Sequence, residues 1–234
     1  MSDIRHETYR DLHSSQLAEE EKLNASSADQ TLSLLQKHLK PQSMLDVGCG
    51  LGTWLAAAQR MGIGDLAGIE GHWLDPKALK VPRELVKQQD LEVGFDLGRK
   101  FDLLVCLEVA EHLSAKSADH FIQCLTRHSP AIAFSAAVPF QGGHHHVNEQ
   151  FLPYWVDMFS RQGYLMIDLF RRRLWNRPDV LWWLRQNMVL FIDGETALKN
   201  DSLRHELQQQ QDPGPVSIIH PELYLSRMQQ AAKH

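Results

Sequence analysis

Short apolar runs alternate along the chain with longer stretches whose apolar residues recur at helical spacing. This pattern predicts strands at residues 44–47, 66–70, 84–89, 101–109, 131–138, 164–170 and 187–192. It predicts helices at residues 29–40, 53–60, 116–127, 149–162 and around 182–183. Most strand runs are apolar throughout their middles, which indicates burial on both faces of a parallel sheet. The alternation predicts a doubly wound α/β fold, in which ligands bind outside the carboxyl ends of the strands.

Polar sequence flanks this alternating region on both sides. Residues 1–28 are expected to form a polar N-terminal arm, or a helix over the domain entrance. Residues 29–194 are expected to form a single domain, and residues 195–234 a polar C-terminal extension. The first helix of the domain is expected to start at an N-cap provided by Ser27 or Asp29.

Three further segments carry expectations about exposure. Residues 208–215 are rich in Gln and contain two prolines, which predicts a mobile tail. Residues 218–224 are more apolar and could dock back on the domain. The basic run at residues 171–173 is expected to be a solvated surface turn.

The composition limits the classes of function. The 234 residues include 24 basic and 29 acidic side chains, with a formal net charge of -5, so no general attraction to nucleic acid or to an anionic membrane is expected. No apolar run approaches the roughly 20 residues of a membrane span, and the N-terminus lacks the apolar core of a secretory signal. Cys49, Cys106 and Cys124 lie in apolar segments without metal or disulfide spacing. We therefore expect a soluble, cytoplasmic protein with buried thiols and with neither a nucleic-acid nor a membrane partner.

A glycine-rich turn follows the first predicted strand. Residues 44–54 (MLDVGCGLGTW) place Asp46 in the strand and glycines at 48, 50 and 52 before a helix start. Alternate glycines let the backbone approach a ligand without a Cβ in the way, and the helix N-terminus favours polar ligand groups. The spacing is Asp-x-Gly-x-Gly-x-Gly, not the Gly-x-Gly-x-x-Gly of dinucleotide-binding folds. The turn therefore predicts a nucleoside-containing cofactor, and the other interpretation is a tight turn that binds no ligand.

Two motifs together carry a family resemblance. The glycine turn resembles the first motif of class I S-adenosylmethionine-dependent methyltransferases, and residues 107–113 (LEVAEHL) resemble the fourth motif of the small-molecule members. The resemblance covers roughly residues 29–192. It implies a seven-stranded, mostly parallel sheet whose last strand is antiparallel, with S-adenosyl-L-methionine as the cofactor.

The resemblance and the strand ends assign the cofactor contacts. Glu70 ends the second strand about 20 residues after the glycine turn, where a carboxylate can accept both ribose hydroxyls; an ordinary solvent-facing acid is the alternative. An acid followed by a backbone amide after the third strand reads the adenine edge in relatives. The residues expected to contact the cofactor are Asp46, Gly48, Cys49, Gly50, Gly52, Glu70, Asp90, Leu91, Leu107 and Glu108.

Methyl transfer to a hydroxyl needs positioning and a base. The loop after the fifth strand (QGGHHHVNEQ, residues 141–150) is similar to bacterial methyltransferases associated with glycan or secondary-metabolite biosynthesis. A neutral imidazole is suited to take a hydroxyl proton, and Asn148 is expected to cap the next helix and to fix His146. The alternative is a solvated histidine turn. The residues expected to take part in the chemistry are His146, His145, Glu111 and His112.

A metal site is a competing interpretation of the same residues. In some relatives a Glu-x-x-Glu-His set holds a divalent cation. Glu108, Glu111 and His112 match these residue types, and a histidine from residues 144–146 could complete the set. Other relatives have Glu-His here without a metal. We favour that reading and expect no metal.

The sequence therefore predicts an O-methyltransferase that acts on a small acceptor, a sugar or a secondary metabolite. Aromatic and amide side chains at residues 182–187 could line the acceptor pocket, although core packing explains Trp182 and Trp183 equally well. The alternative function is a non-catalytic S-adenosylmethionine-binding module, and a nicotinamide dehydrogenase is a weaker third. The acceptor and the oligomeric state do not follow from the sequence.

Overall fold

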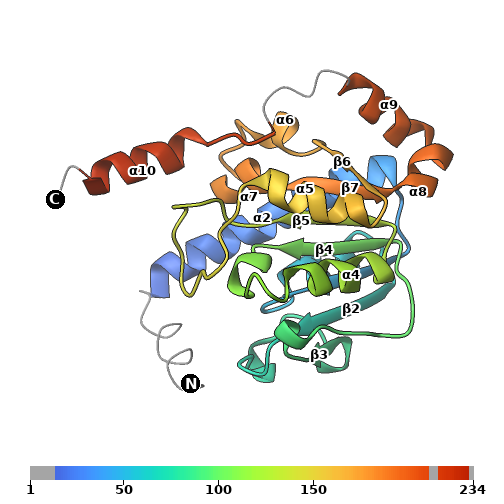
Figure 1. Cartoon of the computed structure of the whole chain (residues 1–234). Coiled ribbons are helices and arrows are strands. Elements are labelled where there is room, and N and C mark those ends of the chain that lie inside the picture. Colours follow the sequence, from blue (N-terminus) through green and yellow to red (C-terminus); the bar gives the residue numbers. More distant parts are fainter. Residues whose placement is uncertain (1–13, 211–215, 232–234) are drawn as a thin grey trace.

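The computed structural model describes residues 14–210 and 216–231, and within them one sheet carries helices on both faces (Figure 1). Its seven strands in this part of the chain are β1 (Ser43–Val47), β2 (Asp65–Glu70), β3 (Val86–Gln88), β4 (Leu103–Leu107), β5 (Ala131–Ser135), β6 (Tyr164–Ile167) and β7 (Val189–Asp193). Their order is β3-β2-β1-β4-β5-β7-β6. The first five strands pair in parallel, and β7 is antiparallel to β5 and β6. The predicted doubly wound, mostly parallel sheet with an antiparallel last strand is confirmed.

The sheet separates two hydrophobic cores. Successive side chains of a strand point to opposite faces, so Met44 belongs to one core and Leu45 to the other. Likewise Leu103 packs in the first core and Leu104 in the second. Because both faces are covered, the strands are apolar throughout instead of alternating with polar residues.

The helices divide between the two faces. The α-helices of the described residues are α2 (Ser14–His38), α3 (Thr53–Arg60), α4 (Ala118–His128), α5 (Leu152–Arg161), α6 (Arg171–Leu174), α7 (Trp182–Asn187), α8 (Gly194–Lys199), α9 (Asp201–Gln209) and α10 (Pro221–Ala231). Short 3-10 turns lie at Pro76–Ala78, Arg83–Leu85, Leu91–Val93 and Ala110–His112. Helices α2, α3 and α7 contribute to the first core, and α4 and α5 to the second.

The first helix is longer than predicted. Helix α2 already includes Ser14, so neither Ser27 nor Asp29 is its N-cap, and the expected boundary at residues 28 and 29 falls inside the helix. Ser27 is fully buried, and its hydroxyl donates to the Leu23 carbonyl at 2.7 Å within the helix. The polar sequence did not indicate this longer helix, because only one side of the helix packs on the domain and few apolar residues are needed there. Residues 1–13 of the predicted arm lie outside the described residues.

The start of α5 is also wrong in the prediction. Its N-cap is Phe151, not Asn148, and Pro153 occupies the first turn. Proline fits there because its missing N–H would have no partner in the helix. Asn148 is instead buried in the preceding loop.

The C-terminal residues pack on the domain in several places. Leu203 of α9 is fully buried in the first core. Residues 218–224 do dock back, since His220 and Leu223 are buried, whereas residues 211–215 of the predicted mobile tail lie outside the described residues. The predicted solvated turn is wrong for Arg171, which is buried because its guanidinium forms an ion pair with Asp168 at 2.9 Å.

Two expectations from the composition can be compared with this structure. All three cysteines are free thiols in buried positions, as predicted. Among the described residues, every helix is too short or too polar to cross a lipid bilayer.

Candidate functional site

The predicted site residues gather at the carboxyl ends of the central strands. The glycine turn follows β1, Glu70 ends β2, and Glu108 follows β4. These three strands are neighbours in the sheet, so their ends lie side by side at one edge, where open α/β sheets bind ligands.

The glycine turn needs all three of its glycines. Their φ angles are 77° at Gly48, 53° at Gly50 and 79° at Gly52, a region that side chains with a Cβ rarely adopt. A Cβ on Gly48 would lie 2.3 Å from the Val109 side chain, and one on Gly52 would lie 2.8 Å from Val81. A Cβ on Gly50 would meet nothing within 4 Å. The backbone of Gly50 therefore borders open space, as a loop that holds a ligand requires.

Glu70 fastens the glycine turn to β2. One carboxylate oxygen accepts the Gly50 N–H at 2.6 Å, and the other accepts the Gly71 N–H at 2.7 Å. Burial raises the pKa of Glu70, and the hydrogen bonds from the two backbone amides offset part of that rise. The carboxylate that is predicted to contact a ribose therefore also shapes the turn.

Asp46 supplies an unsatisfied buried carboxyl beside the turn. It is 3% exposed, and its Oδ2 has no hydrogen-bond partner among the described residues. Burial, with a smaller contribution from the charge of Glu70, raises the pKa of Asp46 to about 8. A buried polar atom without a partner is costly, so this oxygen fits a ligand that brings a cation or a donor, as the amino-acid end of S-adenosylmethionine does.

The remaining predicted cofactor residues line the same edge. Asp90 follows β3 and caps a short turn by accepting the Glu92 N–H at 2.9 Å, while Leu91 is buried behind it. Burial raises the pKa of the Cys49 thiol, which keeps it neutral. Leu107 ends β4 and is half-buried.

Helix α2 reaches the start of α3, which sequence reasoning did not anticipate. The Glu21 carboxylate accepts the Thr53 hydroxyl and pairs with Lys80, and the Asn24 side chain accepts the Trp54 indole N–H at 3.0 Å. Thr53 directly follows the glycine turn, so the first half of α2 packs beside the cofactor loop. The only sequence indication was the expected helix over the domain entrance.

Glu108 lies at the centre of an amide cluster. It has a φ of 53°, and its carboxylate accepts Gln141 Nε2 at 2.7 Å and Asn187 Nδ2 at 3.1 Å. Gln186 extends the cluster by donating to the Asn187 side chain at 2.9 Å. Burial raises the pKa of Glu108, and the hydrogen bonds from Ser135, Asn187 and Gln141 counteract this. The amides at 186 and 187 thus join the site, while Trp182 and Trp183 pack edge to face against each other.

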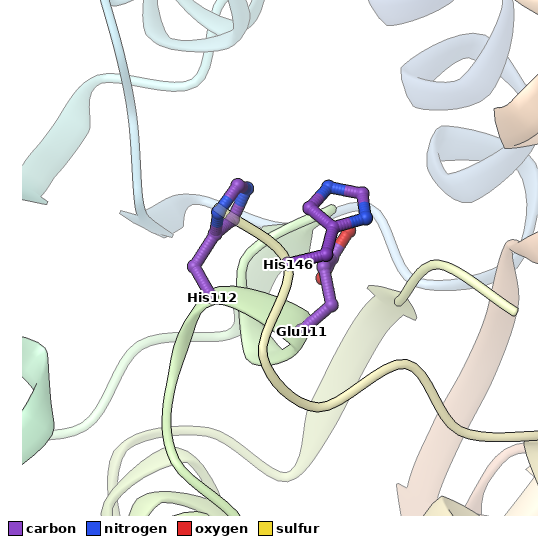
Figure 2. Close-up of side chains that lie close together, drawn as sticks. All are labelled: Glu111, His112 and His146. Carbon is purple, nitrogen blue, oxygen red and sulfur yellow. The ribbon is translucent and has the colours of Figure 1, made fainter. Parts of the chain in front are cut away.

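Glu111, His112 and His146 converge, as Figure 2 shows. One potential ligand atom of each lies within 4.8 Å of the others, and the two imidazole rings meet edge to face with centroids 4.8 Å apart. Glu111 and His112 come from the turn after β4, and His146 comes from the loop after β5. Glu108, which the competing metal interpretation placed with Glu111 and His112, is absent from this cluster within the described chain.

The Glu111 carboxyl is fully buried, and neither of its oxygens has a well-formed hydrogen bond with the described residues. Burial raises its pKa well above the usual range, and the charge of Glu108 adds to this; nearby amides offset only a part. Burial thus favours the neutral form of Glu111, which could donate a hydrogen bond.

Glu149, which sequence reasoning missed, holds the histidine loop. Its Oε1 lies 2.8 Å from His146 Nδ1, and its two oxygens also accept the Phe140 and Gly142 amides at 2.8 Å and 3.1 Å. A proton on Nδ1 shared with this carboxylate leaves the Nε2 lone pair of His146 free to accept another proton. His145 is exposed and has a φ of 57°.

The backbone of Glu111 fixes the other side of this loop. Its carbonyl accepts the Val147 amide at 2.9 Å and the Asn148 amide at 3.0 Å. Position and orientation of His146 therefore come from Glu149 and Glu111, and not from a helix cap at Asn148.

Comparison with known proteins points to one family. A family model described as a methyltransferase domain matches residues 19–187. Norajmaline N-methyltransferase of Rauvolfia serpentina is 35% identical over 100 residues, which are 38% of this chain and 32% of that protein. A ribosomal protein L11 methyltransferase of Laribacter hongkongensis is 36% identical over 78 residues, or 31% of this chain and 25% of that protein. The chain thus spans about a third or less of these relatives.

Solved structures share the fold. The sugar N-methyltransferase KedS8 from Streptoalloteichus has a TM-score of 0.57 at 18% identity, over 72% of this chain and 87% of that chain. The methyltransferase domain of bacterial CtHen1-C has a TM-score of 0.53 at 18% identity, over 74% of this chain and 99% of that chain. At such identities the likeness concerns the fold alone.

Proposed function

The chain belongs to the class I S-adenosylmethionine-dependent methyltransferases, and from this membership we propose that it transfers a methyl group to a hydroxyl of a small acceptor, a sugar or a secondary metabolite. The observation that carries the proposal is the pairing, at one sheet edge, of an open glycine turn with a fixed imidazole. Gly50 and Asp46 offer the cofactor half of the site, and His146 offers the acceptor half.

The cofactor residues would act by binding and orientation. S-adenosylmethionine supplies an electrophilic methyl group on a sulfonium. Asp46 would take the cationic amino-acid end, the backbone at Gly50 would admit it closely, and Glu70 would accept ribose hydroxyls while it holds the turn. Asp90 and Leu91 would contact the adenine.

The acceptor residues would manage one proton. His146, with Nδ1 bound to Glu149, would remove the acceptor proton through Nε2. Glu111 and the neighbouring His112 would complete the polar wall around the acceptor oxygen. His145 is the nearest alternative base, although its exposure leaves it less well fixed.

The direct test is product identification. The purified full chain is incubated with methyl-labelled S-adenosylmethionine and a pooled small-molecule cell extract, and labelled products are identified by mass spectrometry. Label on a hydroxyl oxygen supports the proposal. Label on nitrogen, as the names of the alkaloid and sugar N-methyltransferases suggest for those relatives, would correct the acceptor atom.

Two rival functions predict different behaviour in the same assays. A non-catalytic binding module would bind S-adenosylmethionine and its demethylated product tightly and would never consume the cofactor. A nicotinamide dehydrogenase would be stabilised against heat by NAD, because a ligand that binds only the folded state raises the apparent stability. Thermal-shift measurements with each cofactor separate these cases.

Chelator treatment is expected to leave turnover largely intact. The main reason is that Glu108, one acid of the possible metal set, is already bound by Gln141 and Asn187. Burial also raises the pKa of Glu111, which favours its neutral form over the carboxylate that a cation needs. Turnover is measured before and after EDTA and dialysis. Loss of activity that magnesium or manganese restores would instead assign a cation to Glu111, His112 and His146.

Cofactor affinity is expected to rise with pH up to the pKa of Asp46. That carboxyl has a pKa of about 8 in the folded protein, against about 3.9 when unfolded. Its protonated form stabilises the fold at low pH, and this contribution is lost as the pH rises through the folded-state pKa. A cationic ligand favours the carboxylate, so binding below about pH 8 must release a proton, with at most about a tenfold gain in affinity per pH unit.

Calorimetric titration of S-adenosylhomocysteine in buffers of different ionisation enthalpy measures this proton release. Asp46→Asn is the control, because burial also raises the pKa of Glu70 and only the Asp46 contribution should vanish in the variant. Proton uptake or release that is equal in the two proteins would contradict the assignment.

A further inference from the structure

The segment before α10 is seated on the domain next to the amide cluster. Arg171 Nη1 donates to the Val216 carbonyl at 2.7 Å, and the His220 amide donates to Gln186 Oε1 at 2.7 Å. The His220 ring packs on Trp175 with centroids 4.6 Å apart. A cavity of about 10 Å³ remains between residues 216–218 and the sheet edge, room for about one water molecule. This part of the extension therefore belongs to the folded body.

Helix α10 continues from that segment past the edge of the sheet (Figure 1). Its first turn is fixed by the burial of Leu223 and by an ion pair between Glu222 and Arg185 at 2.5 Å. One turn later, Arg227 Nη2 donates to the Gln141 carbonyl at the start of the histidine loop. Distant parts of the chain thus meet at this loop.

The loop is built to receive this guanidinium. Gly142 has a φ of 73°, and a Cβ on it would lie 2.3 Å from Arg227 Nη2. The absence of a side chain at Gly142 therefore leaves the room that Arg227 uses. Arg227 Nε is buried and has no hydrogen-bond partner within the described chain, so the guanidinium gives up solvent to make this contact.

The two loop residues next to Arg227 connect it to Glu108, an expected cofactor contact, and to His146, the proposed base. The Gln141 side chain binds the Glu108 carboxylate at 2.7 Å. The Gly142 amide binds Glu149 at 3.1 Å, and Glu149 holds His146 at 2.8 Å. A shift of residues 141 and 142 would therefore move a carboxylate and an imidazole together.

We propose that Arg227 is a positioning residue, which clamps the histidine loop so that Glu149 and His146 keep their places, and that α10 is part of the catalytic unit. The role of the clamp in turnover rests on the proposed methyl transfer, whereas the clamp itself is a property of the fold. The helix contributes no atom to the reaction, and it acts through Gln141 and Gly142.

Hydrogen exchange on the full chain with S-adenosylhomocysteine tests the clamp without an acceptor. Arg227→Ala is expected to speed exchange of the amides in residues 140–150 by about tenfold or more, because the loop then opens more often. Arg227→Lys should recover part of the protection, since an ammonium can still donate to the Gln141 carbonyl. Gln229→Ala, an exposed change on the same helix, is the control and should leave the loop unchanged.

Kinetics then separate positioning from general stability. With the pooled extract as the source of acceptor, Arg227→Ala should lower kcat by about tenfold or more, with the cofactor KM within about twofold of the parent value. Unchanged loop exchange, or loosened exchange with full turnover, would overturn the proposal. If the parent chain shows no turnover, the proposed function fails, and the exchange result alone then decides whether Arg227 clamps the loop.

Discussion

Gly50→Val is expected to abolish the binding of S-adenosylmethionine and S-adenosylhomocysteine. The φ of 53° already disfavours a branched side chain, and the space into which its methyl groups would project is open in the structure. In the proposed site, this space is where the cofactor would approach the bare backbone of Gly50. A ligand at about 100 times its Kd stabilises a protein by about 2.7 kcal/mol, and the variant should show none of this in a thermal-shift titration.

Gly62→Val is the matched control for this experiment. Gly62 also has a positive φ, of 86°, and a Cβ on it would also meet nothing within 4 Å. It lies after α3, on the exposed surface, so valine there causes the same kind of backbone strain, about 1 to 3 kcal/mol, without blocking the site. Equal cofactor shifts in the two variants would show that the glycine turn does not hold the cofactor.

The fold was predictable because its central strands are buried on both faces. Continuous apolar runs located β1, β4 and β5 to within a few residues; glycine or proline bounds the runs of β1 and β5, and charged residues flank that of β4. Helix α3 follows the glycine turn at Thr53, as its periodicity indicates. In these segments the local hydrophobic pattern agrees with the burial in the fold, so the sequence is sufficient to predict the secondary structure.

The flanks were less predictable because their packing is long-range. The buried face of α2 touches the domain through a few residues, such as Ala28 and Leu32. The many polar and charged residues around them hide this apolar face in the composition of the segment. Arg171 is buried only because Asp168 and the Val216 carbonyl both meet it. A contact with a residue 45 positions away leaves no trace in local sequence.

The candidate site divides in the same way. The glycines and strand-end acids singled out in the sequence do lie together at the carboxyl ends of β1, β2 and β4, and their role as cofactor contacts stays a prediction. The orientation of His146 was assigned to a cap at Asn148, whereas Glu149 and the Glu111 carbonyl provide it. Glu149 directly follows Asn148 in the sequence, but only the fold of the loop turns its carboxylate back onto Phe140, Gly142 and His146.

His146→Ala is expected to lower turnover by about 10²- to 10⁴-fold, the usual contribution of a general base, with cofactor affinity nearly unchanged. Three contacts fix the imidazole of His146. Glu149 holds Nδ1 at 2.8 Å, the ring packs against His112, and the adjoining amides are bound to the Glu111 carbonyl. Because Glu149 binds Nδ1, Nε2 is the ring nitrogen left to act as the base.

Variants of the neighbouring histidines make this test specific. His144 and His145 are exposed, so alanine at either position should leave turnover within about threefold of the parent value, in line with ordinary surface changes. Initial rates on the identified acceptor, with calorimetric Kd values for S-adenosylhomocysteine, separate a lost base from a lost binding site. A large loss of turnover in His145→Ala, with near-normal turnover in His146→Ala, would assign the base to His145 instead. Near-normal turnover in all three variants would make the loop a surface turn, and the base would then be sought at Glu111 or His112, which reach the same point from the turn after β4.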